Sequence, residues 1–265
     1  MIEDPDAAED LPRHHIRSLG RGLAVIRAFD SEHPTRTLSE VARTTGLSRA
    51  AARRFLLTLV DLGYVSVRDH RFELTPKVLE IGYAYLSSVS LPQLAQRHLE
   101  YIAGEAQESA SVSVLDGRDV IYIARVAKSR IMTVSINVGT RFPAYATSLG
   151  RAILAGLAPD ELDAYLARYD LDPITPRTIT DEGMFRDELA RIREQGYALL
   201  DQELEPGLRS IAVAVRDPSH RAVAATNIST HASRIPMDDL LERLLPILQE
   251  GTARIEYDLA LATPA

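Results

Sequence analysis

Several residue types that would permit particular functions are scarce or missing in this chain. Among its 265 residues there is no cysteine and no tryptophan, and aromatic residues make up only 6%. Without cysteine the chain forms no disulfide, no thiolate metal site and no cysteine nucleophile, which fits a reducing compartment. No apolar run reaches the ~20 residues that a membrane-spanning helix needs, and the acidic start is unlike a secretion signal. We therefore expect a soluble, cytoplasmic protein.

Positive charge is also scarce, since the net charge is −7, but the basic residues are unevenly distributed. Residues 11–80 contain 12 Lys and Arg against 7 Asp and Glu, whereas residues 1–10 contain acidic residues and no basic ones. A basic excess in one segment suggests that this segment alone has a polyanionic partner. At this length and 46% hydrophobic content, the chain can form two hydrophobic cores. We expect an acidic, disordered tail at residues 1–13, followed by two domains.

The pattern of residues 37–75 is that of a winged helix-turn-helix, in which one helix enters the major groove of DNA. Thr37 or Ser39 is suited to cap a short first helix, which Gly46 ends. Ser48 is suited to cap a second helix. Its apolar residues recur at spacings of three and four, as a core-facing side requires, at Ala52, Phe55, Leu56, Leu59 and Leu62. A preceding helix at 18–30 has Leu19, Leu23, Ile26 and Phe29 along one side and begins the domain 14–75.

The opposite side of the second helix is basic and is the predicted recognition surface. Arginine side chains can fork onto guanine edges or phosphates, and alanine permits close approach. Two short strands around Asp69 and His70 predict the wing. The predicted DNA-binding residues are Ser48, Arg49, Ala50, Arg53, Arg54, Arg68 and Arg71. A packing module with a solvated basic face is the alternative, but the order of helix, turn, helix and hairpin favours DNA binding.

An apolar helix is predicted at 76–91, between Pro76 and Pro92, either as a lever between two functional parts or as a spacer. The second domain, 92–265, alternates between helical and strand patterns, which indicates an α+β sheet with helices on its faces. The expected helices are 93–107, 147–157, 159–167, 183–195 and 236–261. The expected strands are 111–115, 119–127, 132–136, 197–201, 210–216 and 222–229.

Several stretches resemble one known family. The start Ser18-Leu19-Gly20-Arg21-Gly22-Leu23 and the run 37–65 resemble the IclR family of bacterial transcription regulators. The stretches 137–151 (NVGTRFPAYATSLGR) and 201–210 (DQELEPGLRS) resemble its branch that includes the protocatechuate-pathway regulators PcaR, PcaU and PobR. The resemblance covers about residues 14–258.

This resemblance implies a winged helix-turn-helix domain, a linker helix and a GAF-like α+β effector domain. It implies dimerisation through the DNA-binding part and often tetramers through the effector part. Members act as repressors or activators. Effectors in this branch are aromatic acids or their ring-cleavage products, such as protocatechuate, 4-hydroxybenzoate and β-ketoadipate.

An effector pocket is expected where Thr147 and Ser148 precede a helix, because hydroxyls and free backbone N–H groups suit a carboxylate. Carried over from the family by position, the candidate effector-binding residues are Ile131, Val134, Tyr145, Ser148, Leu149, Asp201, Ser210, Asn227 and Ser229. Many relatives have cysteine in place of Ser210 and serine in place of Asn227, a difference that bears on which ligand is bound. The alternative is that Ser148 and Ser210 only cap and pack.

Arginine could also neutralise an effector's carboxylate through two parallel hydrogen bonds. The candidates are Arg125, Arg141 and Arg209. Pairing with nearby surface acids is the alternative for each.

Catalysis is the rival interpretation. Ser148, Asp201 and His231 can be drawn as a triad, and Asp116 or Asp119 as part of a carboxylate pair, but no spacing supports either. The chain has no Gly-x-Ser-x-Gly, no Gly-rich phosphate loop and no His-x-x-x-His pair.

We therefore predict a regulator that is not an enzyme and that uses no metal or cofactor. Its expected partners are double-stranded DNA at a palindromic operator, a small organic acid, and further copies of itself in a dimer or tetramer. Two alternatives remain: an IclR-type regulator of another carbon-source pathway with an unrelated acid effector, and an architectural DNA-binding protein without a ligand.

Overall fold

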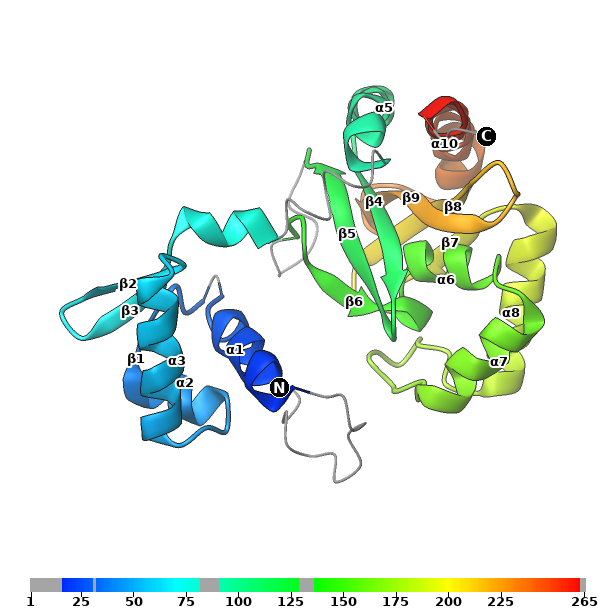
Figure 1. The fold of residues 1–265 in the computed structure, drawn as a ribbon. Coiled ribbons are helices and arrows are strands. Elements are labelled where there is room, and N and C mark those ends of the chain that lie inside the picture. Colours follow the sequence, from blue (N-terminus) through cyan, green and yellow to red (C-terminus); the bar gives the residue numbers. More distant parts are fainter. Residues whose placement is uncertain (1–15, 31, 82–90, 129–135, 263–265) are drawn as a thin grey trace. The chain divides into compact units, whose positions relative to one another are not determined.

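A computed structural model of the chain describes residues 16–30, 32–81, 91–128 and 136–262. It divides into two compact units, residues 1–88 and 89–265 (Figure 1). None of the helices in these described ranges is long and apolar enough to cross a bilayer.

The first unit is a winged helix-turn-helix, as predicted. Its elements are α1 (Arg17–Arg27), β1 (Thr35–Thr37), α2 (Leu38–Thr44), α3 (Arg49–Asp61), β2 (Val65–Arg68), β3 (Arg71–Leu74) and the 3-10 turn η1 (Pro76–Val78). The strands form an antiparallel sheet of order β1-β3-β2, and β1 was not predicted. The helices and the sheet share one core that contains Val25, Val41, Leu56 and Phe72.

The helix caps of this unit are those that the sequence indicates. The Thr37 hydroxyl accepts a hydrogen bond from the Glu40 N–H, and the Glu40 carboxylate accepts one from the Thr37 N–H at 2.7 Å, so the two residues form a capping box. The hydrogen bonds that the Thr37 N–H and hydroxyl donate to the Glu40 carboxylate lower the pKa of Glu40. The Ser48 hydroxyl accepts from the Ala51 N–H at 3.2 Å and caps α3. Gly46, with φ of 68°, makes the turn between the two helices.

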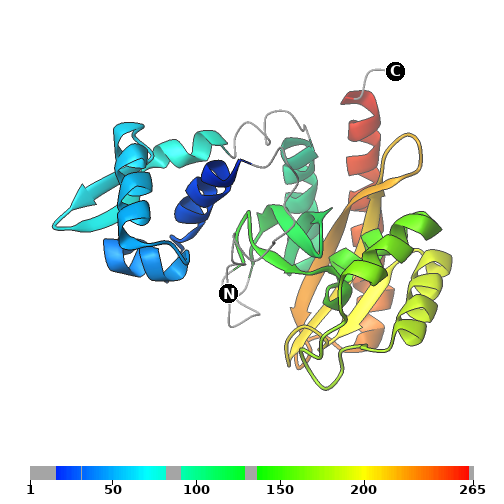
Figure 2. The same cartoon turned by 60° about the horizontal axis from the view of Figure 1, so that its bottom comes forward.

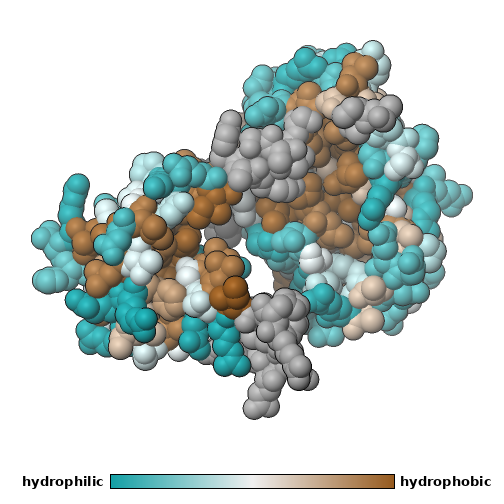
Figure 3. All heavy atoms as spheres, viewed as in Figure 1, coloured by the Kyte–Doolittle hydropathy of each residue, from teal (hydrophilic) through white to brown (hydrophobic). Residues whose placement is uncertain are grey.

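Three apolar residues predicted to face the core are exposed. Leu62 is 53% exposed because α3 ends at Asp61 and Leu62 lies beyond its last turn. On α1, Leu19 and Leu23 are 63% and 45% exposed. The buried residues of this helix are instead the small Ala24 and its neighbour Val25. The buried side of α1 is therefore rotated by about one residue from the side that Leu19 and Leu23 occupy. Hydrophobic side chains accordingly reach the surface over α1 (Figure 3).

The second unit is a six-stranded antiparallel sheet of order β6-β5-β4-β9-β8-β7 (Figures 1 and 2). Its strands are β4 (Ser109–Asp116), β5 (Asp119–Val126), β6 (Arg141–Pro143), β7 (Ala198–Asp201), β8 (Leu208–Arg216) and β9 (Ala222–His231). Its helices are α5 (Leu91–Ala106), the 3-10 turn η2 (Ala144–Ala146), α6 (Ser148–Leu154), α7 (Pro159–Arg168), α8 (Glu182–Gln195), α9 (Met237–Asp239), the π-helical turn η3 (Leu240–Leu244) and α10 (Leu245–Ala262).

Helices cover both faces of this sheet. Helices α5 and α10 lie side by side over one face in both ribbon views (Figures 1 and 2). They approach closely at Gly251, where an added Cβ would lie 2.3 Å from Ile102 Cγ1. On the other face, α6 packs against β8 and β9 with α8 behind it, around a core that includes Ile153, Phe185 and Leu189. The α+β prediction is confirmed.

Some predicted boundaries differ. The helix predicted at 236–261 contains a π-helical turn, which precedes Pro246. Proline donates no N–H to the preceding turn, and a widened turn accommodates its ring. Of the strand predicted at 132–136, only Ile136 is described, and it is not in a strand. Of the helix predicted at 76–91, the structure describes η1 and a helical start at 79–81, while residues 82–90 lie outside the described ranges.

Candidate functional sites

The predicted recognition helix, α3, buries one side and presents arginines on the other. Ala52 and Leu56 are fully buried in the core of the first unit. Arg49, Arg53 and Arg54 are exposed, and within the part of the chain that the structure describes their guanidinium groups form no hydrogen bond or ion pair. Groups in this state can contact phosphates or base edges without first breaking a bond inside the protein.

The two arginines of the wing differ from each other. Arg68 is exposed at the end of β2, beside the turn Asp69-His70, whose positive φ values of 46° and 61° suit a two-residue hairpin. Arg71 instead donates from Nε to Thr35 Oγ1 at 3.0 Å and from Nη2 to the Thr35 carbonyl at 3.1 Å. Arg71 thus ties β3 to β1, while Arg68 remains available to DNA.

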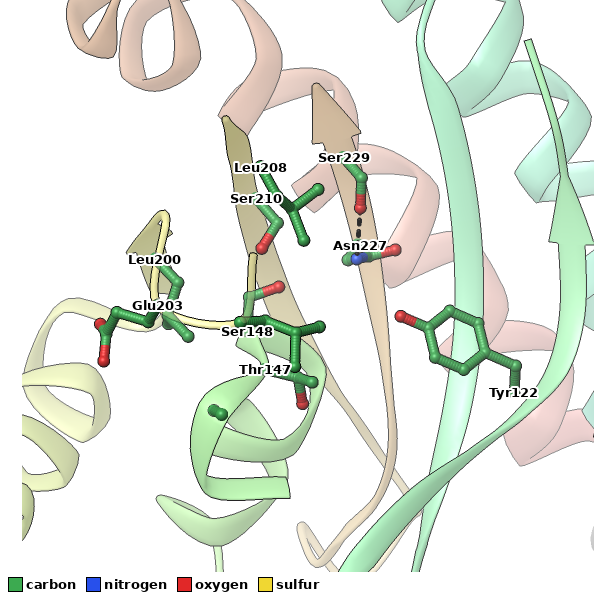
Figure 4. Close-up of a pocket in the computed structure, with 11 residues that line it drawn as sticks. Tyr122, Thr147, Ser148, Leu200, Glu203, Leu208, Ser210, Asn227 and Ser229 are labelled. Atoms are coloured by element: carbon green, nitrogen blue, oxygen red, sulfur yellow. Dashed lines mark hydrogen bonds between the residues drawn. The ribbon is translucent and has the colours of Figure 1, made fainter. Parts of the chain in front are cut away.

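The second unit contains a cavity between the start of α6 and strands β5, β7, β8 and β9 (Figure 4). It is lined by Tyr122, Ala146, Thr147, Ser148, Leu200, Glu203, Leu204, Leu208, Ser210, Asn227 and Ser229. Of the nine predicted effector-binding residues, Ser148, Ser210, Asn227 and Ser229 meet here. The sequence reasoning missed Tyr122, Glu203 and the leucines, which have no distinctive local motif.

Two buried polar atoms in this cavity have no hydrogen-bond partner among the residues that the structure describes: Ser148 Oγ and Asn227 Oδ1. Asn227 Nδ2 donates to Ser229 Oγ at 2.9 Å, so only the carbonyl end of the amide is unpaired. The hydroxyl of Tyr122 points toward Asn227 (Figure 4). Burial raises the pKa of Tyr122 to about 12, so this hydroxyl is neutral and can donate. Because a buried unpaired polar group costs about 1–3 kcal/mol, these atoms indicate a site that a polar ligand would complete.

The cavity is small. It offers about 20 Å³ to the centre of a water molecule, which is room for roughly one water. A ligand of the size of an aromatic ring is larger than this space.

A buried ion pair fixes one wall. Arg151 is fully buried, and its guanidinium donates to the Tyr145 carbonyl at 2.6 Å and to both oxygens of Glu203. The Ile179 N–H also donates to Glu203. At Gly150 an added Cβ would lie 2.1 Å from the Ala144 carbonyl oxygen, so glycine permits η2 to pack against α6. The Glu203 carboxylate is thus held by Arg151 and points away from Ser210 and Asn227 (Figure 4).

Five predicted effector-binding residues are not placed in the cavity wall. The Tyr145 hydroxyl donates to the Asp172 carbonyl at 2.9 Å. Leu149 is buried in the core, because consecutive residues of a helix point in very different directions and Leu149 directly follows Ser148. Asp201 follows the lining residue Leu200 on β7 and so points to the opposite face. Ile131 and Val134 lie outside the described residues.

Asp201 is held by two arginines, Arg177 and Arg209, with Arg209 Nε at 2.8 Å. Burial alone would raise the pKa of Asp201, but the hydrogen bond and charge of Arg209, with Arg177, outweigh this and lower it. His231 contacts Ser233 at 2.8 Å, so the triad drawn on paper does not form. Asp116 and Asp119 both pair with Arg141, at 2.7 and 3.1 Å, which explains them as surface ion pairs.

One site suited to nucleic acid and one suited to a small polar molecule, in separate units of one chain, define a ligand-responsive DNA-binding transcription regulator. Residues 18–69 match the model of the IclR helix-turn-helix domain, and residues 83–257 match that of the bacterial transcriptional regulator IclR C-terminal domain. The chain belongs to the IclR family of bacterial transcription regulators. It is accordingly a regulator and not an enzyme.

Three similar proteins show which members of the family this chain resembles. The Pca regulon regulatory protein of Pseudomonas putida is 44% identical over 92% of this chain and 84% of its own length. A putative transcriptional regulator from Rhodococcus sp. RHA1 has a similar structure, with a TM-score of 0.84 and 55% identity over 94% of this chain and 100% of that one. A double mutant of the PobR inducer-binding domain from Acinetobacter, in complex with 3-hydroxybenzoic acid, has a TM-score of 0.59 and 30% identity over 62% of this chain and 97% of its own.

Proposed function

We propose that this regulator controls genes of aromatic-acid catabolism and that its effector is a small aromatic acid of the hydroxybenzoate class, bound in the cavity of the second unit. The observation that carries the proposal is the pair of unpartnered atoms, Ser148 Oγ and Asn227 Oδ1, in a wall that also has the neutral hydroxyl of Tyr122. An acceptor and hydroxyls beside leucines suit a flat ring with polar substituents. The similarity to the Pca regulon protein and to the PobR inducer-binding domain supports the same ligand class.

On the DNA side, Arg49 and Arg53 contact base edges, Arg54 and Arg68 hold phosphates, and Arg71 positions the wing. Ser48 and Ala50 lie at the start of α3, where a recognition helix approaches the bases. We infer a palindromic operator read by two copies of the chain, in a dimer or tetramer, in the cytoplasm where the DNA is. Two-fold related recognition helices one helical turn of DNA apart read such a sequence.

The effector acts by changing which arrangement of subunits is populated. A ligand shifts this equilibrium only by its difference in affinity for the two states, which is typically worth about 1–3 kcal/mol. The narrow cavity would give such a difference, because a state with separated walls binds the ring more tightly.

Calorimetric titration tests the proposal without knowledge of the operator. The purified chain is titrated with 4-hydroxybenzoate, protocatechuate and β-ketoadipate. We expect saturable binding of an aromatic acid, weakened about 3- to 10-fold in Ser148→Ala, as for the loss of one hydrogen bond. Ser219→Ala is the matched control, since Ser219 lies in an exposed turn of the same unit. Binding of none of the acids would reject the ligand class and favour a regulator of another carbon-source pathway.

A further inference from the structure

The polar wall of the cavity continues beyond it along the same sheet face. Strand β4 lies between β9 and β5, and its residues Ser109, Ser111 and Ser113 are fully buried on the face that carries Asn227. Ser111 is the register partner of Asn227 on one side and of Arg125 on the other. The alternate residues Ala110 and Val112 belong to the core under α5. A row of buried hydroxyls thus leads from the cavity to Arg125, about two strand spacings or roughly 10 Å away.

Arg125 differs from four other arginines of the second unit. Its Nη1 donates to Ser111 Oγ at 2.9 Å, while its Nε is buried and has no partner within the described part of the chain. No carboxylate in the described ranges pairs with it. The others each pair with an acid: Arg118 with Asp172, Arg141 with Asp116, Arg151 with Glu203 and Arg209 with Asp201.

As far as the described residues go, this arginine is therefore a partly desolvated cation without a counter-ion. Burial lowers the pKa of Arg125, and the neighbouring Tyr122 partly opposes this shift. A guanidinium group nonetheless stays charged in proteins, so the cost of desolvating it remains until an anion pairs with it. Ser113 Oγ, on the same face, is also buried without a partner. Tyr122 connects the cavity with Arg125, since it lines the cavity and interacts electrostatically with Arg125.

The opposite end of the cavity is less suited to a carboxylate. Glu203 lines it, and the guanidinium of Arg151 is already paired with the Glu203 carboxylate, so this arginine is not free to bind a second anion. Helix α6 has only seven residues, Ser148–Leu154, so its dipole is short. Neutral hydroxyl groups of a ligand would instead pair well with Ser148 and Ser210.

We propose that the effector's carboxylate binds Arg125, which Ser111 orients, and that the ring points its other polar substituents toward Ser148 and Ser210. This rests on the proposed function and assigns the orientation of its ligand, opposite to the one that the helix start suggested. Arg125 does not line the cavity itself, so a ligand that reaches both Arg125 and Ser148 displaces the side chains between them.

Paired ligands test the orientation. 4-Hydroxybenzoate and the uncharged 4-hydroxybenzamide are titrated calorimetrically into the wild-type chain, Arg125→Met and Arg125→Lys. We expect the wild type to prefer the acid about 10- to 100-fold, the range for a hydrogen bond to a charged group. Arg125→Met should lose this preference while binding the amide as the wild type does. Arg125→Lys should retain part of it, because the charge remains and the two-pronged geometry is lost.

The control is Arg254→Met, which removes the same charge from an exposed residue of α10 on the other face of the sheet. It should leave the preference for the acid unchanged. If the wild type binds neither ligand, the proposed ligand class is wrong. If the wild type prefers the acid and Arg125→Met keeps that preference, the ligand class stands and the role of Arg125 is overturned. Amide binding by Arg125→Met also reports that the variant is folded.

Discussion

The two sites of this chain use arginine in opposite ways. On α3, Arg49, Arg53 and Arg54 are exposed and unpaired, so hydration stabilises their charges until DNA replaces the water. In the second unit, Arg151 is fully buried and two oxygens of Glu203 compensate it. Exposed cations provide affinity for DNA at little cost to the free energy of folding. A buried cation instead has to be paired with an anion, which either the fold or a ligand supplies.

The largest expected effect comes from breaking the buried ion pair between Arg151 and Glu203. Arg151→Met leaves Glu203 without its cation, and removing one partner of a buried pair costs about 3–5 kcal/mol. We expect a loss of this size in the free energy of unfolding of the second unit, measured by urea denaturation. Arg191→Met removes an exposed arginine paired with Glu188 and should cost at most about 1 kcal/mol. Equal effects of the two substitutions would contradict the contrast between buried and exposed arginines.

The next largest effect lies on the recognition helix. Arg53→Ala should weaken binding to a selected operator by about 1–3 kcal/mol and relax one base position, without changing the free energy of unfolding by more than a few tenths. The measurement is fluorescence anisotropy on operator variants, after selection of a binding site from random duplexes. Arg27→Ala, on an exposed position of α1, is the control. Unchanged affinity in Arg53→Ala would remove this residue from the set that reads bases.

A smaller effect is expected at the capping box of α2, which contributes to the stability of the first unit and is not one of the proposed DNA contacts. Thr37→Ala removes the hydroxyl half of the capping box of α2, while the backbone N–H of residue 37 still donates to Glu40, and it should cost about 0.5–2 kcal/mol of its stability. The pKa of Glu40 is lowered in the folded protein. Its contribution to the free energy of unfolding is therefore present above the ordinary pKa of a carboxyl group, and this contribution is lost as the pH falls through the lowered pKa. Thermal unfolding from pH 7 down to 3 should therefore show less acid destabilisation in Thr37→Ala than in wild type. Parallel curves for the two proteins would show that the box does not set this dependence.

The smallest effect distinguishes the wing arginines. Arg68→Ala should reduce the slope of log K against log salt for DNA binding by about 0.9, as for one lost phosphate contact, and leave unfolding unchanged. Arg71→Ala should also lower the melting temperature of the first unit, because it removes the hydrogen bonds to Thr35. If Arg68→Ala lowered the melting temperature and Arg71→Ala did not, the assigned roles would be reversed.

The DNA-binding unit was largely predictable because its signals are local. The caps Thr37 and Ser48 and the turn at Gly46 each act within a few residues, and the structure has them where the sequence placed them. The exceptions, Leu19 and Leu23, concern which side of α1 is buried. That choice depends on how the helix packs on its neighbours, since small residues permit the closest approach.

The cavity was predictable only in part. Ser148, Ser210, Asn227 and Ser229 were named from family positions and do line it. Tyr145 and Leu149 were named in the same way, yet both are held in the core, where a rotation of one residue along a turn decides the direction of a side chain. Tyr122 was missed because nothing around it in the sequence marks it as different from other strand aromatics.

The sequence by itself determined most of the helices, the long strands, the caps of α2 and α3 and the basic side of α3, because these follow from periodicity and from contacts between near neighbours. Only the tertiary structure decided which arginines have a carboxylate partner and which do not. Arg151 meets Glu203 from 52 positions away, and β4 lies between β5 and the distant β9, which brings Arg125, Ser111 and Asn227 into one row. Such pairings depend on strand order and register, which local sequence patterns do not specify.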